Sequence, residues 1–71
     1  MAYLTENQIE EMAHEAYETY FVSADKRAAI RRAKEHCIDQ FGITPRKSAV
    51  LHAYNLAMTQ WEEDKISSTL N

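Results

Sequence analysis

The scarcity of glycine and proline constrains the fold of this chain more than any other feature. Its 71 residues contain one glycine, Gly42, and one proline, Pro45, which lie three positions apart. Strands and hairpins usually need such turn residues between them, whereas helices avoid both residues in their interior. No apolar run alternates with polar residues, and neither Asn-Gly nor Asp-Gly occurs. The sequence therefore predicts an all-α fold whose best-marked corner is at residues 42–45.

The apolar residues recur at intervals of three and four, which is the pattern of amphipathic helices. A first helix is expected over residues 6–21, because Thr5 and Gln8 form a capping-box pattern at its start. A second is expected over 24–41 and a third over 45–65. The predicted core stripes are Ile9, Met12, Ala13, Ala16, Tyr17, Tyr20 and Phe21, then Ile30, Ala33, Cys37, Ile38 and Phe41, then Val50, Leu51, Tyr54, Ala57, Met58 and Trp61.

The ends of the second and third helices follow from their capping residues. Ser23 is expected to cap the second helix, with Asp25 in its first turn. Gly42 is expected to end that helix in the left-handed conformation. Thr44 is expected to cap the third helix, with Pro45 in the first helical position.

The two loops are short, so successive helices should pack as antiparallel neighbours. We predict a single three-helix domain over residues 1–65, followed by a frayed tail at residues 66–71. With one cysteine the chain cannot form an internal disulfide. Small domains without such a link often gain stability by pairing with another chain. A homodimer is therefore one open alternative.

The third helix carries a second apolar stripe, Ala49, Ala53 and Leu56, on the side away from its main stripe. A helix that is apolar on two sides is normally buried on two sides. Either this helix is central in the bundle, or its second stripe contacts a partner protein.

Charge is divided along the chain. Residues 1–25 contain six acids and no Lys or Arg, whereas residues 26–52 contain seven bases and two acids. The first helix therefore presents an acidic strip, Glu11, Glu15 and Glu18. Two explanations remain open: the strip pairs with bases of the second helix, or it binds a basic partner.

The segment Gly42-Ile43-Thr44-Pro45-Arg46 resembles the turn of DNA-binding helix-turn-helix units. Cys37, Phe41 and Leu51 match the apolar support positions of that motif, while Ile38 and Ser48 depart from it. The resemblance covers about 20 of the 71 residues. It implies a DNA-binding regulator using Arg31, Arg46 and Lys47. In this register the outward residues would be Arg46, Ala49, Val50 and Ala53, which offer little for reading base edges.

The sequence shows no pattern typical of an enzyme. It lacks a glycine-rich phosphate loop, and the three histidines and Cys37 lack the local spacing of metal ligands. No cofactor or metal site is expected. No apolar run reaches the roughly 20 residues of a membrane span, and a lone thiol fits the cytoplasm. We expect a small regulator, adaptor or inhibitor of a larger machine, of the kind that bacteria and phages encode as accessory proteins.

Overall fold

The computed structural model of the protein describes residues 4–70, with side chains described from Leu4 to Ile66. It contains three α-helices, α1 (Glu6–Ser23), α2 (Lys26–His36) and α3 (Lys47–Leu70). A π-helical turn, η1 (Cys37–Phe41), continues α2. No strand occurs among the described residues. The predicted all-α fold of three helices is confirmed.

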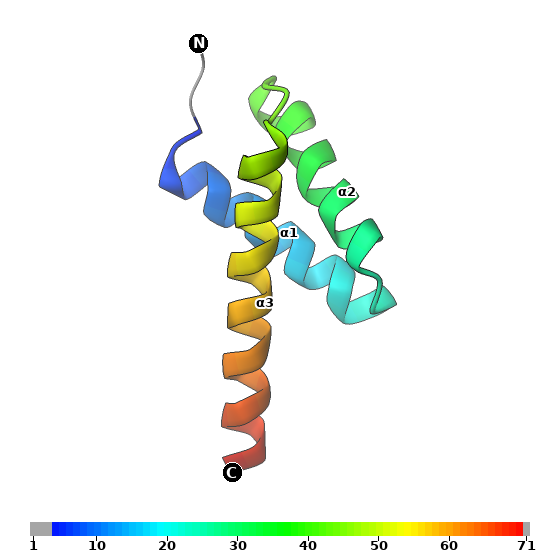
Figure 1. Cartoon of the computed structure of the whole chain (residues 1–71), viewed down its shortest axis with the longest axis vertical. Helices are drawn as coiled ribbons and strands as arrows, with labels where there is room; N and C mark the ends of the chain where they lie inside the picture. The colour runs from blue at the N-terminus through cyan, green and yellow to red at the C-terminus, as the bar shows by residue number, and fades with distance from the viewer. Residues whose placement is uncertain (1–3, 71) are drawn as a thin grey trace.

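The three helices run in alternating directions (Figure 1). α2 and α3 meet at the corner formed by residues 42–46 and diverge from there, while α1 crosses behind α3 and joins the far end of α2. The C-terminal part of α3 projects beyond the other two helices, which gives the molecule extents of 45 × 22 × 18 Å. This projecting part includes most of the segment predicted as a frayed tail, because α3 is helical through Leu70 rather than ending at residue 65. Asn71 lies outside the described residues.

The start of α1 is the predicted capping box. The Thr5 hydroxyl accepts a hydrogen bond from the Gln8 backbone N–H at 3.2 Å, and the Gln8 side chain accepts one from the Thr5 N–H at 2.9 Å. The helix ends two residues later than predicted, at Ser23. Ala24 then takes the left-handed conformation (φ 54°), and its N–H donates to the Tyr20 carbonyl.

The cap of α2 differs from the prediction. The Ser23 hydroxyl donates to the Thr19 carbonyl and so belongs to the end of α1. Asp25 is the N-cap instead, and its carboxylate accepts from the backbone N–H groups of Arg27 and Ala28. Because the left-handed Ala24 redirects the chain one residue after Ser23, only Asp25 lies close enough to the first turn to cap it.

Gly42 ends the second helical segment as predicted. Its φ is 65°, and its N–H donates to the Ile38 carbonyl at 3.0 Å. Two neighbouring predictions were wrong. Ile38 is 41% exposed, because the stripe that faces the core steps by four residues through Ala29, Ala33 and Cys37. α3 begins at Lys47 rather than at Pro45, because Pro45 is buried in the corner and Arg46 provides the first helical carbonyl.

The core is built largely from alanine. Six of its ten buried residues are alanines, and only Met12 and Cys37 are large side chains that are fully buried. Such small side chains let helix axes approach closely. The larger aromatic and aliphatic residues pack around this centre, half-buried, at the sides of the helices.

Candidate protein-interaction site

The second apolar stripe of α3 divides between core and surface. Ala53, predicted to contact a partner, is fully buried, so this prediction was wrong. Ala49 is half-buried, and Leu56 is 38% exposed. The reason is that α3 packs across α1, so the side of α3 that carries Ala53 faces another helix. Of the stripe Ala49, Ala53 and Leu56, only Leu56 presents a large apolar surface to solvent.

Leu56 lies in an open groove between α1 and α3. The groove has a volume of about 660 Å³, and its apolar residues include Ala13, Leu56 and Ala57. Ala13 and Ala57 are buried, so they form its base. The exposed residues at its mouth are polar, and they are Glu10, His14, Thr59, Gln60, Glu63 and Asp64. We call this site the α1–α3 groove.

Asp64 is held in place at the α1–α3 groove by two hydrogen bonds. The Tyr17 hydroxyl donates to one carboxylate oxygen at 2.6 Å, and the Gln60 amide donates to the other at 3.0 Å. The hydrogen bond to Asp64, with smaller contributions from burial and from the carboxylate charge, raises the pKa of Tyr17 above its ordinary 10.0. Tyr17 is therefore neutral and donates at physiological pH, which fixes the carboxylate.

An aromatic cluster packs around Tyr17, the residue that donates to Asp64. The ring of Trp61 lies 5.8 Å from that of Tyr17, 5.4 Å from Tyr20 and 5.7 Å from Phe21, measured between centroids. The rings are tilted or edge-on, which is the arrangement that aromatic pairs prefer. The cluster connects the C-terminal half of α1 to α3 beside the groove, which Tyr17 also lines.

The mouth of the α1–α3 groove is acidic. Glu10 comes from α1, whereas Glu63 and Asp64 come from α3, and none of the described Lys or Arg residues lines the groove. Glu10 and Glu63 have no ion pair or hydrogen bond within the described part of the chain. Sequence reasoning did not place Glu10, Glu63 and Asp64 at the site. The available signal was the run Glu62-Glu63-Asp64, which starts six residues after Leu56.

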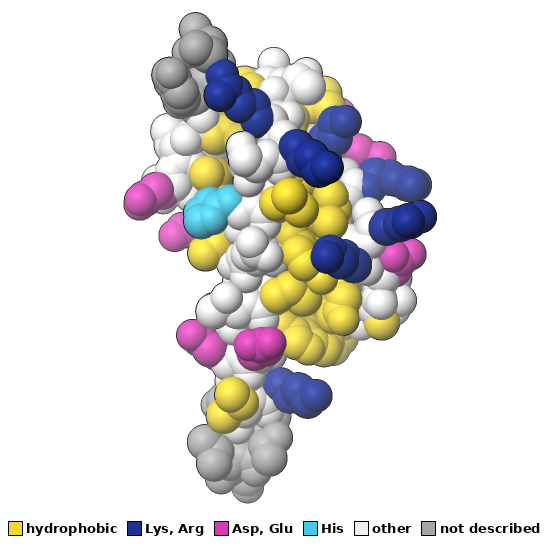
Figure 2. Space-filling model, viewed as in Figure 1, with side chains coloured by type: hydrophobic (Ala, Val, Ile, Leu, Met, Phe, Trp, Pro, Cys, Tyr) yellow, Lys and Arg dark blue, Asp and Glu magenta, His cyan; other side chains and the backbone are white. Residues whose placement is uncertain are grey.

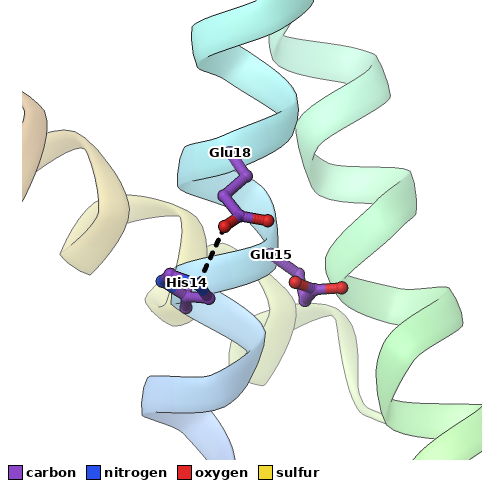
Figure 3. Close-up of side chains that lie close together, drawn as sticks. All are labelled: His14, Glu15 and Glu18. Carbon is purple, nitrogen blue, oxygen red and sulfur yellow. Dashed lines mark ion pairs between the residues drawn. The ribbon is translucent and has the colours of Figure 1, made fainter.

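The predicted acidic strip is divided among three different environments. Glu15 points towards α2, where its carboxylate accepts from Arg32 at 2.9 Å and lies 3.6 Å from His36. Glu18 pairs with His14 at 3.0 Å on the exposed side of α1 (Figure 3). Glu11 is exposed and has no partner among the described side chains. The internal pairing with the second helix therefore accounts for Glu15, but it does not account for Glu11 or Glu18.

His14, Glu15 and Glu18 are also the described residues that come closest to a metal-ligand set, with ligand atoms within 4.8 Å of one another. Figure 3 shows that His14 and Glu18 point towards each other, whereas Glu15 points away towards α2. All three come from one helix, and Glu15 is already bonded to Arg32. The arrangement is that of an ordinary helical ion pair at spacing four.

The basic residues gather on a different face. Figure 2 shows Lys and Arg side chains around hydrophobic side chains, over α2 and the start of α3. The exposed bases of α2 and of the start of α3 include Arg31, Lys34, Arg46 and Lys47, and we call these four residues the basic face. Beside it, the Lys26 ammonium lies 5.5 Å from the centre of the Tyr54 ring. The three residues predicted for DNA contact, Arg31, Arg46 and Lys47, are thus all on the surface.

The predicted outward register at the start of α3 was wrong for two residues. Val50 and Ala53 are buried, and Ala49 is half-buried. The exposed positions are instead polar or basic for the most part, and they are Arg46, Lys47, Ser48, Leu51, His52 and Asn55. The reason is that α3 turns its small residues towards the other helices. The corner therefore offers more polar side chains to a ligand than its sequence indicated.

Cys37 and His36 lie inside the corner. The Cys37 thiol donates to the Ile43 carbonyl at 3.2 Å, and burial raises its pKa, so it is protonated at neutral pH. The His36 ring packs edge-on against Phe41, and its buried Nε2 atom has no hydrogen-bond partner. Neighbouring helical residues do not face each other, and within the described part of the chain His36 forms its ion pair with Glu15, at 3.6 Å.

Comparison with protein-family models, with curated proteins and with solved structures finds no match to this chain. Among the described residues, no helix combines the length and the apolar character that a membrane span requires.

Proposed function

We propose that this chain is a non-enzymatic protein–protein interaction module, acting as a cytoplasmic regulator, adaptor or inhibitor of a larger assembly, of the kind bacteria and phages encode. Its contact site is the α1–α3 groove. The observation that supports this most strongly is Leu56, an exposed apolar side chain over a base of buried alanines and within a mouth of acids. An apolar centre surrounded by polar residues is the usual anatomy of a protein interface.

The helix α3 provides a matched control for this proposal. Leu51 is 37% exposed and Leu56 is 38% exposed, but only Leu56 lines the groove. Replacing either leucine by glutamate removes the same apolar surface and adds the same charge. The two variants should therefore differ only in which face of α3 they alter.

The experiment places a photo-crosslinking amino acid at Thr59, at the mouth of the groove, in cells that express the chain. We expect a crosslinked protein that Leu56→Glu removes and that Leu51→Glu retains. The mass of the purified chain, measured by light scattering, shows whether the partner is a second copy, the homodimer alternative. Crosslinking that responds equally to both variants, or to neither, would exclude the groove as the contact site.

DNA binding by the corner is the second candidate, supported by the exposed Arg46, Lys47, His52 and Asn55 at the start of α3. These side-chain types contact phosphates and base edges. This candidate predicts tight binding to some duplex at physiological salt, which Arg46→Ala weakens and Lys65→Ala, near the far end of α3, does not. Fluorescence anisotropy with a random duplex library tests it. Binding that stays micromolar or weaker for every sequence and disappears with modest salt would reject it.

A further inference from the structure

The α1–α3 groove has a charge that restricts what can occupy it. Glu10, Glu63 and Asp64 place three carboxylates at its mouth from two helices, and no described Lys or Arg lines it. Charges at an interface favour partners of opposite sign and exclude partners of the same sign, because juxtaposed like charges cost several kcal/mol. Nucleic acid, whose backbone is anionic, is therefore a poor occupant of this site.

Asp64 has the geometry of a prepared hydrogen-bond acceptor. Each of its two oxygens already accepts one hydrogen bond, from Tyr17 and from Gln60. A carboxylate offers about four acceptor positions, so Asp64 retains capacity for about two more donors. An arginine side chain can supply two parallel N–H groups to one carboxylate. Because Tyr17 and Gln60 fix the carboxylate beforehand, little conformational entropy is lost when a donor binds.

The apolar base of the groove favours an occupant that also carries an apolar side chain. Leu56 is large and 38% exposed, and the neighbouring Ala57 and Ala13 are small and leave room above them. An apolar side chain that covers Leu56 would remove its surface from water, at about 25 cal/mol for each Å² buried. A helix that presents apolar residues at every third or fourth position fits a groove between two helices.

We propose that the occupant of the α1–α3 groove is a basic amphipathic helix of a partner protein, with an apolar side chain over Leu56 and Lys or Arg beside Glu10, Glu63 and Asp64. This inference rests on the proposed function, since it names the partner of the same site. It adds the sign of the partner's charge and the form of the bound segment, which can be tested without knowing the partner's identity.

Two synthetic peptides of 18 residues test the inference by calorimetry against the full chain. They share one leucine stripe at helical spacing, and their polar faces are either all lysine and arginine or all glutamate. Both lack tryptophan and tyrosine, so the fluorescence of Trp61, the single tryptophan of the chain, reports on binding beside Tyr17. We expect the basic peptide to bind and to change Trp61 emission, and the acidic peptide not to bind.

Two double variants separate the groove from net charge. Glu10→Gln with Glu63→Gln neutralises the mouth of the groove, whereas Glu35→Gln with Asp39→Asn removes the same charge from exposed sites on α2 and η1. We expect at least a tenfold loss of affinity for the basic peptide in the first variant and less than a twofold change in the second. Leu56→Ser should also weaken binding about tenfold, and Leu51→Ser should not.

Each of the remaining outcomes overturns this inference for a different reason. If the acidic peptide binds as well as the basic one and Leu56→Ser weakens both, the groove is a docking site but its partner is not basic, so this inference fails while the proposed function stands. If the basic peptide binds equally to both double variants, it recognises net charge alone, and the inference fails. If neither peptide binds, the inference fails, and the crosslinking at Thr59 still decides the proposed function.

Self-association of the chain is a further outcome. If the purified chain forms oligomers, and the double variant Glu10→Gln with Glu63→Gln is monomeric, the occupant of the groove is a second copy and the inference is overturned.

Discussion

Leu51 and Leu56 lie on the same helix and are 37% and 38% exposed, yet their surroundings are opposite in charge. Leu56 lies in the α1–α3 groove among Glu10, Glu63 and Asp64. Leu51 lies one turn after Lys47, on the part of α3 that contributes to the basic face. Exposure alone therefore does not define a site on this protein. The neighbouring helix decides which chemistry surrounds an exposed apolar residue.

The two faces also differ in how firmly their charged groups are held. At the groove, Asp64 accepts hydrogen bonds from Tyr17 and Gln60, and the aromatic cluster lies behind it. At the basic face, Lys34 and Lys47 are exposed and have no partner within the described residues. A held carboxylate favours recognition of a particular donor, whereas mobile cations favour general attraction.

Trp61→Ala should have the largest effect, because it removes three aromatic contacts between α1 and α3. Truncating a fully buried tryptophan to alanine costs about 3–5 kcal/mol, and Trp61 is half-buried, so we expect a loss of about 2–3 kcal/mol in the free energy of unfolding. Chemical denaturation measures it. The NMR chemical shifts of Tyr17 and Asp64 should change, and those of Lys47 should not. Trp61→Phe should recover about half of the lost free energy of unfolding. Equal shifts at both faces would mean that the cluster does not act on the groove in particular.

Glu15→Gln should have a smaller effect, because Glu15 connects the acidic α1 to the basic α2 through Arg32. Because Arg32 is partly exposed, solvent weakens the pair, and we expect a loss of about 1 kcal/mol, at the upper end for solvent-exposed ion pairs. Glu11→Gln is the matched control, since Glu11 is exposed without a partner, and it should change stability by less than about 0.5 kcal/mol. Urea unfolding at low and high salt measures both variants. If Glu15→Gln and Glu11→Gln changed the free energy of unfolding equally, the pair with Arg32 would contribute nothing to stability.

Tyr17→Phe should change the dependence of stability on pH more than stability at neutral pH. The pKa of Tyr17 is raised in the folded state, so the unfolded chain loses this proton first as the pH rises. The contribution of Tyr17 to stability is therefore complete below pH 10 and declines above it. We expect the decline above pH 10 to be less steep in Tyr17→Phe than in the wild type, measured by urea unfolding at a series of pH values. If stability declined equally steeply above pH 10 in both proteins, the hydrogen bond between Tyr17 and Asp64 would not be the cause of the decline.

Neutralising the groove should have the smallest effect, and it should be stabilising. Glu10 and Glu63 lie near Asp64 without partners, and each like-charge contact costs a few tenths of a kcal/mol at most. Glu10→Gln with Glu63→Gln should raise Tm by about 1–2 °C at low salt, since about 1 kcal/mol corresponds to about 4–8 °C in a domain of this size. Glu35→Gln with Asp39→Asn should not raise Tm, because Glu35 lies four residues after Arg31 on α2, where the opposite charges attract. A rise in both variants would indicate a general effect of net charge.

Local signals in the sequence predicted the elements of the fold well. The capping box at Thr5 and the left-handed stop at Gly42 were both confirmed, because each depends on residues within four positions of one another. The cap of α2 and the start of α3 were misplaced by two residues. Their competing candidates, Ser23 against Asp25 and Pro45 against Lys47, lie close together, and the choice depends on how each loop turns and packs.

Only part of the candidate site could be predicted. Leu56 was identified from its place on a second apolar stripe, but Ala53 on the same stripe is buried, because periodicity cannot show how many helices will cover a face. Glu10 and Asp64 are separated by more than 50 positions in the chain, and nothing local indicates that they share a groove. The division of Glu11, Glu15 and Glu18 likewise depends on where α2 lies.

Residue order alone accounts for the three helices, for the corner at Gly42 and for the distribution of acids and bases along the chain. These properties arise from backbone preferences and residue order, which act over a few positions. The tertiary structure decided which exposed residues share a surface. α1 crosses α3 at an angle that buries Ala53, leaves Leu56 open and brings Glu10 to the same groove as Glu63 and Asp64. That angle results from the packing of alanines and of the Trp61 cluster, in which residues far apart in the chain must fit together at once.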